Sequence, residues 1–250
     1  MNNNFPLVSV IVITYQSAKF ILEALESVKA QTWKNIELIV SDDGSNDNTI
    51  ELCTHWIEQN HERFFDTKII TVANNTGIPA NCNRGLKSAS GSWLKLIAGD
   101  DVLLNNCIED NIEYSLLFPE VSFIVSDMQE IDDYSRIINN RIKNQGLVFF
   151  TKMKSTKEQL KAYARWPSFL NTPTFFFTKE LIETINYFDE EFKIYEDMSL
   201  IYKILSNGIE IYYLDKQTVK YRIHEKATSR TSKIDDLRGK EALQIFKKYR

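Results

Sequence analysis

Apolar residues in the first half of the chain follow two alternating patterns. Continuous β-branched apolar runs predict strands buried on both faces at residues 7–13, 36–40, 68–72, 93–98 and 121–125. Apolar residues spaced along one helical face predict helices at residues 17–31, from about 48, at 79–89 and at 107–117. This alternation is typical of α/β proteins and predicts a doubly wound, mainly parallel sheet flanked by helices.

The pattern loosens beyond Met128. A polar stretch runs to Gln145, and an aromatic-rich region follows it. Helical periodicity returns at residues 178–185 and 198–205, and strand patterns return at 209–214 and 219–224. Because we find neither an internal repeat nor a low-complexity linker, we predict one domain with halves at 1–127 and 128–230, followed by a basic tail at 231–250.

Composition narrows the class of protein. A formal net charge of −4 gives no electrostatic basis for nucleic-acid binding. The three cysteines form neither a CxxC pair nor a disulfide framework, which favours a reducing cytoplasm. The apolar run at residues 7–13 is far shorter than the roughly 20 residues that cross a bilayer. We therefore expect a cytoplasmic protein that lies, at most, on the inner surface of a membrane.

Acidic residues gather where the predicted strands end. Asp42-Asp43 follow the second strand, Asp100-Asp101 follow the fourth, and Asp127 follows the fifth. Any one cluster is better explained by helix capping or turn formation. Ligands of open α/β sheets bind at this edge, however, and two acid pairs gathered there repel each other unless a cation is present. The pattern therefore favours a site for a phosphate and a hard cation such as Mg²⁺ or Mn²⁺.

The glycine-rich signatures of common phosphate-binding proteins are missing from the sequence. It contains no GxxxxGK[ST] loop, no GxGxxG and no protein-kinase signature set. Phosphates would therefore be held through a metal and side chains. Phosphotransfer chemistry, nucleotide-sugar chemistry and a receiver-like regulatory domain all stay open on the residues alone.

Five ordered segments resemble a known family. They are SVIVITYQSAKFILEALESVKAQTWKNIELIVSDDGSNDNT, NNTGIPANCNRGLKSASGSWLKLIAGDD, TPTFFFTKELIETINYFDEEF, YEDMSL and YRIHEKATS. The chain thus resembles the family 2 glycosyltransferases of bacterial polysaccharide and lipopolysaccharide synthesis, which have the GT-A fold. The resemblance implies that residues 1–127 bind a nucleotide sugar, and that 128–230 bind the acceptor and carry the catalytic base.

The resemblance also implies which residues bind the donor. The implied set is Thr14, Tyr15, Asp43, Asn75, Gly77, Asn83, Arg84 and Asp100. Within it, Asp43 would hydrogen-bond the edge of uracil. Two positions depart from the family pattern: Ala98 replaces the first acid of a frequent DxDD motif, and Cys82 replaces an arginine. Arg84 could take over the diphosphate contact of that arginine.

The same resemblance implies which residues bind the metal and which residue acts as the base. Asp100 and Asp101 match a DXD-type motif that coordinates Mn²⁺ or Mg²⁺ on the donor diphosphate, and His224 matches a histidine that reaches the metal in some members. Asp197, in the motif Glu196-Asp197, matches the base of an inverting transfer. On local sequence alone, the two acids could equally satisfy a helix N-terminus, and His224 could be an ordinary strand-end histidine.

Acceptor-side contacts have weaker candidates, namely Trp166, Thr174 and Glu196. Trp166 lies in a predicted loop beside Pro167, where it could stack on a sugar ring. The nearby Phe175 to Phe177 are better explained as a buried strand.

The tail carries eight Lys or Arg and three acids between Lys226 and Arg250. A basic amphipathic helix there could lie on an anionic membrane, which would suit a lipid-linked acceptor. A solvated or core-packed terminal helix is the favoured alternative.

We therefore predict a metal-dependent, inverting glycosyltransferase. It would move a sugar from a nucleotide sugar, UDP-linked, to a hydroxyl of a saccharide acceptor that is lipid-linked. The competing hypotheses are a nucleotidyl- or phosphotransferase and a non-catalytic module that binds nucleotide sugars.

Overall fold

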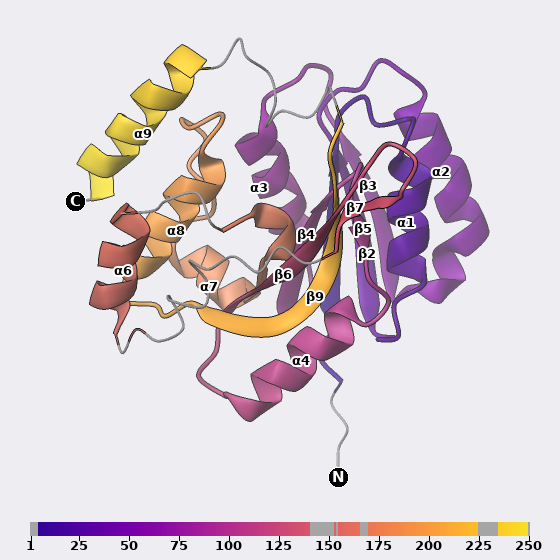
Figure 1. The fold of residues 1–250 in the computed structure, drawn as a ribbon. Coiled ribbons are helices and arrows are strands. Elements are labelled where there is room, and N and C mark those ends of the chain that lie inside the picture. Colours follow the sequence, from indigo (N-terminus) through magenta and orange to yellow (C-terminus); the bar gives the residue numbers. More distant parts are fainter. Residues whose placement is uncertain (1–4, 141–152, 154, 166–169, 225–234, 250) are drawn as a thin grey trace.

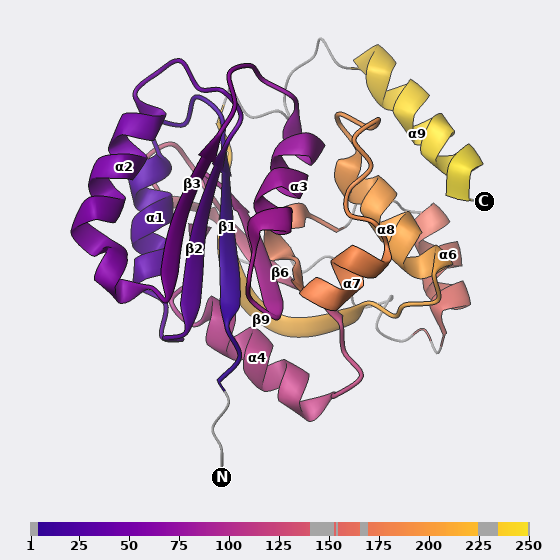
Figure 2. The same cartoon turned by 180° about the vertical axis from the view of Figure 1, so that it is seen from behind.

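The structure is a computed structural model that describes residues 5–140, 153, 155–165, 170–224 and 235–249. A curved mixed sheet lies between two layers of helices (Figures 1 and 2). The described strands are β1 (Val8–Thr14), β2 (Ile36–Asp42), β3 (Asp66–Thr71), β4 (Trp93–Ala98), β5 (Val102–Leu103), β6 (Phe123–Ile131), β7 (Ile137–Asn139), β8 (Phe176–Thr178) and β9 (Tyr212–Arg222). The described helices are α1 (Ile21–Lys29), α2 (Thr49–Asn60), α3 (Ile78–Ser88), α4 (Cys107–Leu117), α6 (Thr156–Arg165), α7 (Lys179–Thr184), α8 (Glu196–Ser206) and α9 (Asp235–Tyr249), with short 3₁₀ turns η1 (His61–Arg63) and η2 (Thr172–Thr174).

The first half forms the expected parallel sheet. Its strands lie in the order β3-β2-β1-β4, and all three pairings are parallel. Alternate side chains of β1 pack on opposite faces, with Val10 and Val12 on one side and Ile11 on the other. Helices on both faces bury these residues, which explains why the strand reads as a continuous apolar run. The predicted α/β fold class is confirmed.

The second half adds strands in mixed directions. β8 runs antiparallel between β4 and β6, and β9 lies between β6 and β5. The structure corrects two predictions here. β6 continues to Ile131, so Asp127 lies inside a strand and not at its end. The strands predicted at 209–214 and 219–224 are one bent strand, β9, whose pairing with β6 shifts register beside Asp127. The polar residues of these strands lie at that irregularity and interrupt the apolar pattern.

Two hydrophobic clusters stabilise the fold, one on each face of the sheet. One cluster joins the sheet to α1, α2 and α4, and the other joins it to α3, α6, α7, α8 and α9. The three cysteines are free thiols, each buried in one of these clusters. Helix α6 was not predicted from the sequence. The division at residue 127 stays a prediction, because the clusters follow the faces of the sheet and draw on both halves.

The terminal helix α9 belongs to the second cluster. Ile245 is fully buried, and Ala242 and Phe246 pack beside it. The ring of Phe246 lies 5.5 Å from that of Tyr202 on α8, and both views show α9 alongside α8 (Figures 1 and 2). This packing supports the core-packed alternative for the tail. Within the described ranges, no helix has the length and apolar character that crossing a membrane would need.

Candidate active site

Three parallel strands end level with one another at one edge of the sheet. The register pairs Thr14 with Asp42 across β1 and β2, and Ile13 with Ala98 across β1 and β4. Strand β9 ends close by, because β5, directly after Asp101, pairs with it. The acids after β2 and β4 are therefore brought to one edge, as the strand-end pattern predicted, and the end of β9 lies beside them.

Asp42 is bound by the protein itself, mainly by the turn that follows it, and its carboxylate also accepts from the Thr71 hydroxyl at 3.1 Å. One of its carboxylate oxygens accepts hydrogen bonds from the backbone N–H groups of Gly44 (3.0 Å) and Ser45 (2.9 Å). The other accepts from the Ser45 hydroxyl at 2.5 Å. These bonds close the turn after β2, where Gly44 has a φ of 79° that favours glycine. The turn-forming alternative therefore accounts for Asp42.

Asp43 is buried in an internal network. Its carboxylate accepts from the backbone of Thr76 (3.0 Å) and Gly77 (2.8 Å), and it pairs with Arg84 at 2.8 Å. Burial raises the pKa of Asp43, but the bonds from Thr76, Arg84 and Gly77 outweigh it, so the net pKa lies below its ordinary value. Asp43 thus fixes the loop around Thr76 and orients Arg84. Its contact with a nucleotide base stays a prediction.

Asp100 and His224 meet although 124 residues separate them in the sequence. The imidazole Nε2 lies 2.9 Å from the Asp100 carboxylate oxygen Oδ2, and both side chains are partly accessible. Two adjacent ligands of an octahedral ion with bonds of about 2.1 Å lie about 3 Å apart. The pair therefore has the spacing of two metal ligands. No third His, Cys, Asp or Glu of the described chain completes a cluster with them, so a bound ion would also need oxygens from substrate or water.

Asp101 faces the protein interior. It is 1% exposed, and its Oδ1 accepts from the backbone N–H of Arg222 at 2.8 Å. Its Oδ2 is buried without a hydrogen-bond partner among the described residues. Burial and the neighbouring Asp100 charge raise the pKa of Asp101 well above its ordinary value. Direct metal ligation by Asp101 stays a prediction. The contact that the structure shows is with the end of β9, two residues before His224.

Sequence reasoning missed Arg222, although it lies within the quoted YRIH segment. The side chain is 1% exposed, and its guanidinium donates to the carbonyl oxygens of Asp100 (2.7 Å) and Asp132 (2.8 Å). It also pairs with Glu23 at 2.5 Å and lies over the ring of Phe20, 4.5 Å from the centroid. A buried arginine needs such partners, so Arg222 fixes the turn at Asp100 to β9 and α1. The sequence signal was an arginine at an inward position of a strand.

Glu196 and Asp197 are the first two residues of α8. Glu196 is 9% exposed, and one of its carboxylate oxygens has no hydrogen-bond partner in the described part of the chain. Burial and the adjacent Asp197 raise the pKa of Glu196 well above its usual range. Burial also raises the pKa of Asp197 to about 6, while its bond from the Met198 N–H (2.6 Å) acts in the opposite direction. Asp197 therefore satisfies a helix N-terminus and also has a pKa suited to a general base.

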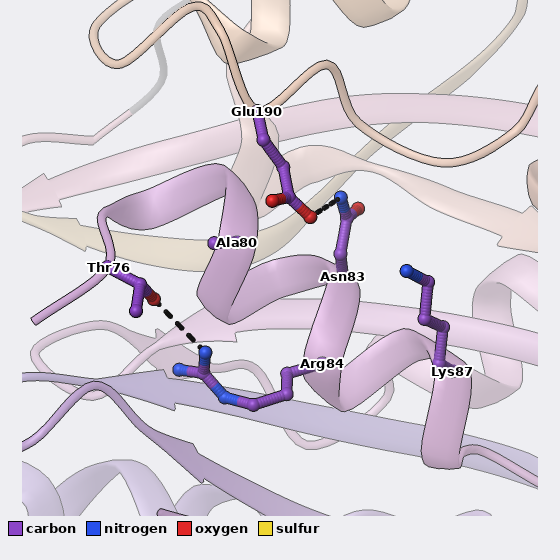
Figure 3. A pocket seen from close by; sticks show the side chains of 6 residues that line it. All are labelled: Thr76, Ala80, Asn83, Arg84, Lys87 and Glu190. Carbon is purple, nitrogen blue, oxygen red and sulfur yellow. Dashed lines mark hydrogen bonds between the residues drawn. The ribbon is translucent and has the colours of Figure 1, made fainter. Parts of the chain in front are cut away.

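The donor-side residues of α3 border a cavity of about 300 Å³ (Figure 3). The Asn83 amide donates to Glu190 (2.8 Å) and to the Phe188 carbonyl (3.0 Å), so it fixes the segment that leads towards α8. Arg84 points towards Thr76, to which it donates at 3.1 Å. Figure 3 shows Lys87 beside them on the same helix. The structure therefore commits the side chain of Asn83, a predicted nucleotide contact, to internal bonds.

The other predicted donor-side residues lie around the same edge. Tyr15 is half-exposed, whereas the Thr14 side chain is buried and its carbonyl oxygen accepts from Asp43 N–H. The Asn75 side chain accepts from the N–H of Gly77, whose φ of 97° favours glycine.

On the acceptor side, Thr174 is buried within η2. Lys95, a buried lysine that sequence reasoning also missed, donates to the carbonyl oxygen of Phe175 at 3.2 Å and to that of Pro173. Trp166 lies outside the described residues.

Comparison with known proteins gives one family. The sequence profile described as Glycosyl transferase family 2 matches residues 9–185. An uncharacterized glycosyltransferase of Rickettsia typhi is 29% identical over 245 residues, which cover 97% of this chain and 71% of the relative. Glycosyltransferase GlyG of Streptococcus pneumoniae is 33% identical over 103 residues, covering 41% of this chain and 33% of GlyG.

Solved structures share the fold. Staphylococcus aureus TarS 1–349 in complex with UDP-GlcNAc has a TM-score of 0.70 and 23% identity, over 90% of this chain and 61% of that one. The Pyrobaculum calidifontis mannosyltransferase PcManGT, in complex with GDP-Man and Mn²⁺, has a TM-score of 0.71 and 19% identity, over 97% and 64%. The chain thus spans less than two thirds of these two structures, and the likeness shows the GT-A fold.

Proposed function

The chain belongs to glycosyl transferase family 2, and from that premise we propose that it transfers a sugar from a UDP-sugar to a hydroxyl of a saccharide acceptor. The proposed reaction depends on a divalent metal and inverts the anomeric centre. The saccharide acceptor is proposed to be linked to a lipid, and residues 1–127 and 128–230 to bind donor and acceptor respectively. The complexes of TarS with UDP-GlcNAc and of PcManGT with GDP-Man support a nucleotide-sugar donor.

The contact between Asp100 and His224 carries the proposal. It joins the turn after β4 to the end of β9 with two metal-ligating atoms 2.9 Å apart. Oxygen and imidazole ligands suit Mn²⁺, whereas Mg²⁺ prefers oxygens alone. A bound metal would neutralise charge on the leaving diphosphate. The proposed ligands of this chain are Asp100 and His224, with Asp101 holding the backbone of the strand that presents His224.

Asp197 is the proposed base. It would accept the proton of the acceptor hydroxyl as that oxygen attacks the anomeric carbon and the bond to the nucleoside diphosphate breaks. A pKa of about 6 leaves Asp197 mostly unprotonated at neutral pH while keeping it more basic than an ordinary aspartate. One displacement with such a base inverts configuration. Burial and the neighbouring Asp197 raise the pKa of Glu196 well above its usual range, and its contact with the acceptor is part of the proposal.

Donor binding would involve the edge between β1 and α3. Tyr15 is accessible there for stacking on a base. Arg84 lines the cavity and is bound by Asp43 and Thr76. The proposed donor contacts are Thr14, Tyr15, Asp43, Asn75, Gly77, Asn83, Arg84 and Asp100. Within this set, the accessible Tyr15 ring suits a nucleotide base, and the partly accessible Arg84 guanidinium suits a diphosphate.

A product assay tests this proposal. The purified chain is incubated with UDP-GlcNAc or GDP-mannose, with Mn²⁺ or Mg²⁺, and with candidate saccharide acceptors. We expect free nucleoside diphosphate and a glycosylated acceptor of inverted configuration. Release of pyrophosphate would instead indicate a nucleotidyltransferase, and activity that survives removal of metal by a chelator would contradict the role of Asp100 and His224.

The base assignment has its own variant. Asp197→Asn should lower kcat by about 10²- to 10⁴-fold, the range that a general base contributes, with donor binding retained. Isothermal titration with UDP and Mn²⁺ measures that binding. Wild-type activity in Asp197→Asn would show that the base lies elsewhere. Binding of nucleotide sugars by the wild type without any transfer would instead favour a non-catalytic module.

A further inference from the structure

Helix α9 reaches the segment that precedes the proposed base. Glu241, near the middle of the helix, is 3% exposed although it is a glutamate. Its carboxylate accepts three consecutive backbone N–H groups, from Lys193 (2.8 Å), Ile194 (3.0 Å) and Tyr195 (3.2 Å). Asp197 follows two residues later. Glu241 therefore holds the backbone directly before the reacting carboxylate.

At the start of α8, Asp197 binds the N–H of Met198, but the N-cap residue contributes no side chain. Tyr195 occupies the N-cap position and makes no side-chain cap hydrogen bond. A helix N-terminus leaves backbone N–H groups without partners and favours a negative charge nearby. Glu241 supplies such a charge from another helix and binds the N–H groups that lead into the first turn. The direction in which α8 begins, and with it the position of Asp197, depends on this contact.

Helix α9 is itself firmly attached, so it can act as a fixed support. Ile245 is fully buried in the core, and Lys248 pairs with Asp189 (3.2 Å) and Glu191 (2.7 Å) of the loop before α8. The same segment also reaches the donor side, because the Lys193 ammonium donates to the Thr76 carbonyl at 3.2 Å. Glu241 thus joins α9 to a segment that contacts Thr76 on one side and leads to Asp197 on the other.

We propose that Glu241 is a positioning residue that sets the geometry and environment of Asp197 through the backbone of residues 193–195. The inference rests on the proposed role of Asp197 as base. Loss of the Glu241 carboxylate would free three N–H groups, let the first turn of α8 move and admit water to Asp197. A small displacement of a catalytic group lowers the rate strongly, since even about 1 Å can cost 10²-fold.

The test compares substitutions of Glu241 with a matched substitution of a second glutamate, Glu191. Glu241→Gln removes the charge and places an amide N–H₂ against donors, and Glu241→Ala removes the contact. Glu191→Gln removes a charge that also joins α9 to this loop but touches none of the three N–H groups. We expect kcat to fall by about 10- to 100-fold in both Glu241 variants, and to stay within about twofold in Glu191→Gln.

Two further readouts separate positioning from general stability. The acid limb of the kcat–pH profile, near pH 6 in the wild type because burial raises the pKa of Asp197 to about 6, should move to lower pH in the Glu241 variants as water reaches the carboxylate. Hydrogen exchange of the amides at 193–195 should accelerate in Glu241→Ala and not in Glu191→Gln. Glu241→Asp, which keeps the charge, should recover part of kcat.

The outcomes are distinguishable from failure of the proposed function. If Asp197→Asn abolishes transfer while Glu241→Ala keeps the wild-type kcat and pH profile, the positioning role is wrong and the base stands. Unchanged exchange at 193–195 in Glu241→Ala would also overturn it, with or without a known acceptor. If Asp197→Asn is fully active, the base assignment is wrong, whatever Glu241 does.

Discussion

The acids after β2 and those after β4 begin from the same sequence pattern and have different surroundings. Protein donors occupy both carboxylates after β2, because Asp42 closes a turn and Asp43 binds Thr76, Gly77 and Arg84. After β4, Asp101 has a buried oxygen without a partner among the described residues, and Asp100 contacts a side chain that is itself a potential metal ligand. The acids after β2 therefore stabilise the fold, whereas Asp100 after β4 stays partly accessible beside a second potential metal ligand.

Among the acids at the strand ends, we expect the largest loss of activity from a substitution after β4. Asp100→Asn should lower transfer by about 10²- to 10³-fold, because loss of a charged metal ligand removes several kcal/mol of charge stabilisation in the transition state. Steady-state kinetics over a range of Mn²⁺ concentrations measures it, and higher metal should restore part of the rate. Asp110→Asn on α4, whose carboxylate pairs with Lys216, is a control that should leave the rate unchanged.

The pH dependence extends the comparison to the third acid pair. Because burial raises the pKa of Asp197 to about 6, the proposed base is protonated below that pH and unprotonated above it. The rate should therefore rise with pH through about 6 and fall about tenfold for each unit below it. A kcat–pH profile between pH 4.5 and 8 measures this limb, and its absence in a chemistry-limited reaction would contradict the base assignment.

A smaller effect separates Asp101 from Asp100. Asp101→Asn keeps a carbonyl oxygen that can accept from the Arg222 N–H, so transfer should stay within about tenfold of the wild type. The same Mn²⁺ titration compares both variants. Equal losses in Asp100→Asn and Asp101→Asn would mean that both carboxylates bind the metal directly.

The smallest expected effect on chemistry comes from the acids after β2. Asp43→Asn should reduce the free energy of unfolding by roughly 2–3 kcal/mol, because its amide N–H₂ would face donors that now bind a carboxylate. Since the pKa of Asp43 is lowered below 3.8 in the folded state, its contribution is present above pH 3.8 and lost as pH falls through the folded value. Urea unfolding at pH 7 and pH 3 measures both, with Glu58→Gln on the exposed face of α2 as control. A loss of transfer without a loss of stability would mean that the proposed donor contact of Asp43 outweighs its role in the fold.

The sequence predicted the regular half of the molecule better than the irregular half. Strand and helix periods between residues 7 and 117 are local properties of buried strands and amphipathic helices, so β4 and α4 were predicted at their observed bounds. The antiparallel insertion of β8 and the bend of β9 depend on contacts between distant segments, which no local period records. For the same reason, the sequence could locate the acid pairs but could not tell which of their carboxylates are bound by donors of the protein itself. Arg222, Lys95 and Glu241 were missed because a charged residue reads as exposed until its buried partners are known.

The position of β9 has a consequence for when this enzyme can become active during its synthesis. The partners Asp100 and His224 are separated by 124 residues, and closing so long a loop is slow compared with forming the local contacts of the parallel strands. A growing chain can therefore assemble β1 to β4 early, with the acids of β2 and β4 in place. It cannot pair Asp100 with His224 until β9 has left the ribosome and been added between β6 and β5. On the proposed role of Asp100 and His224, a chain still under synthesis would lack the metal pair until β9 is in place.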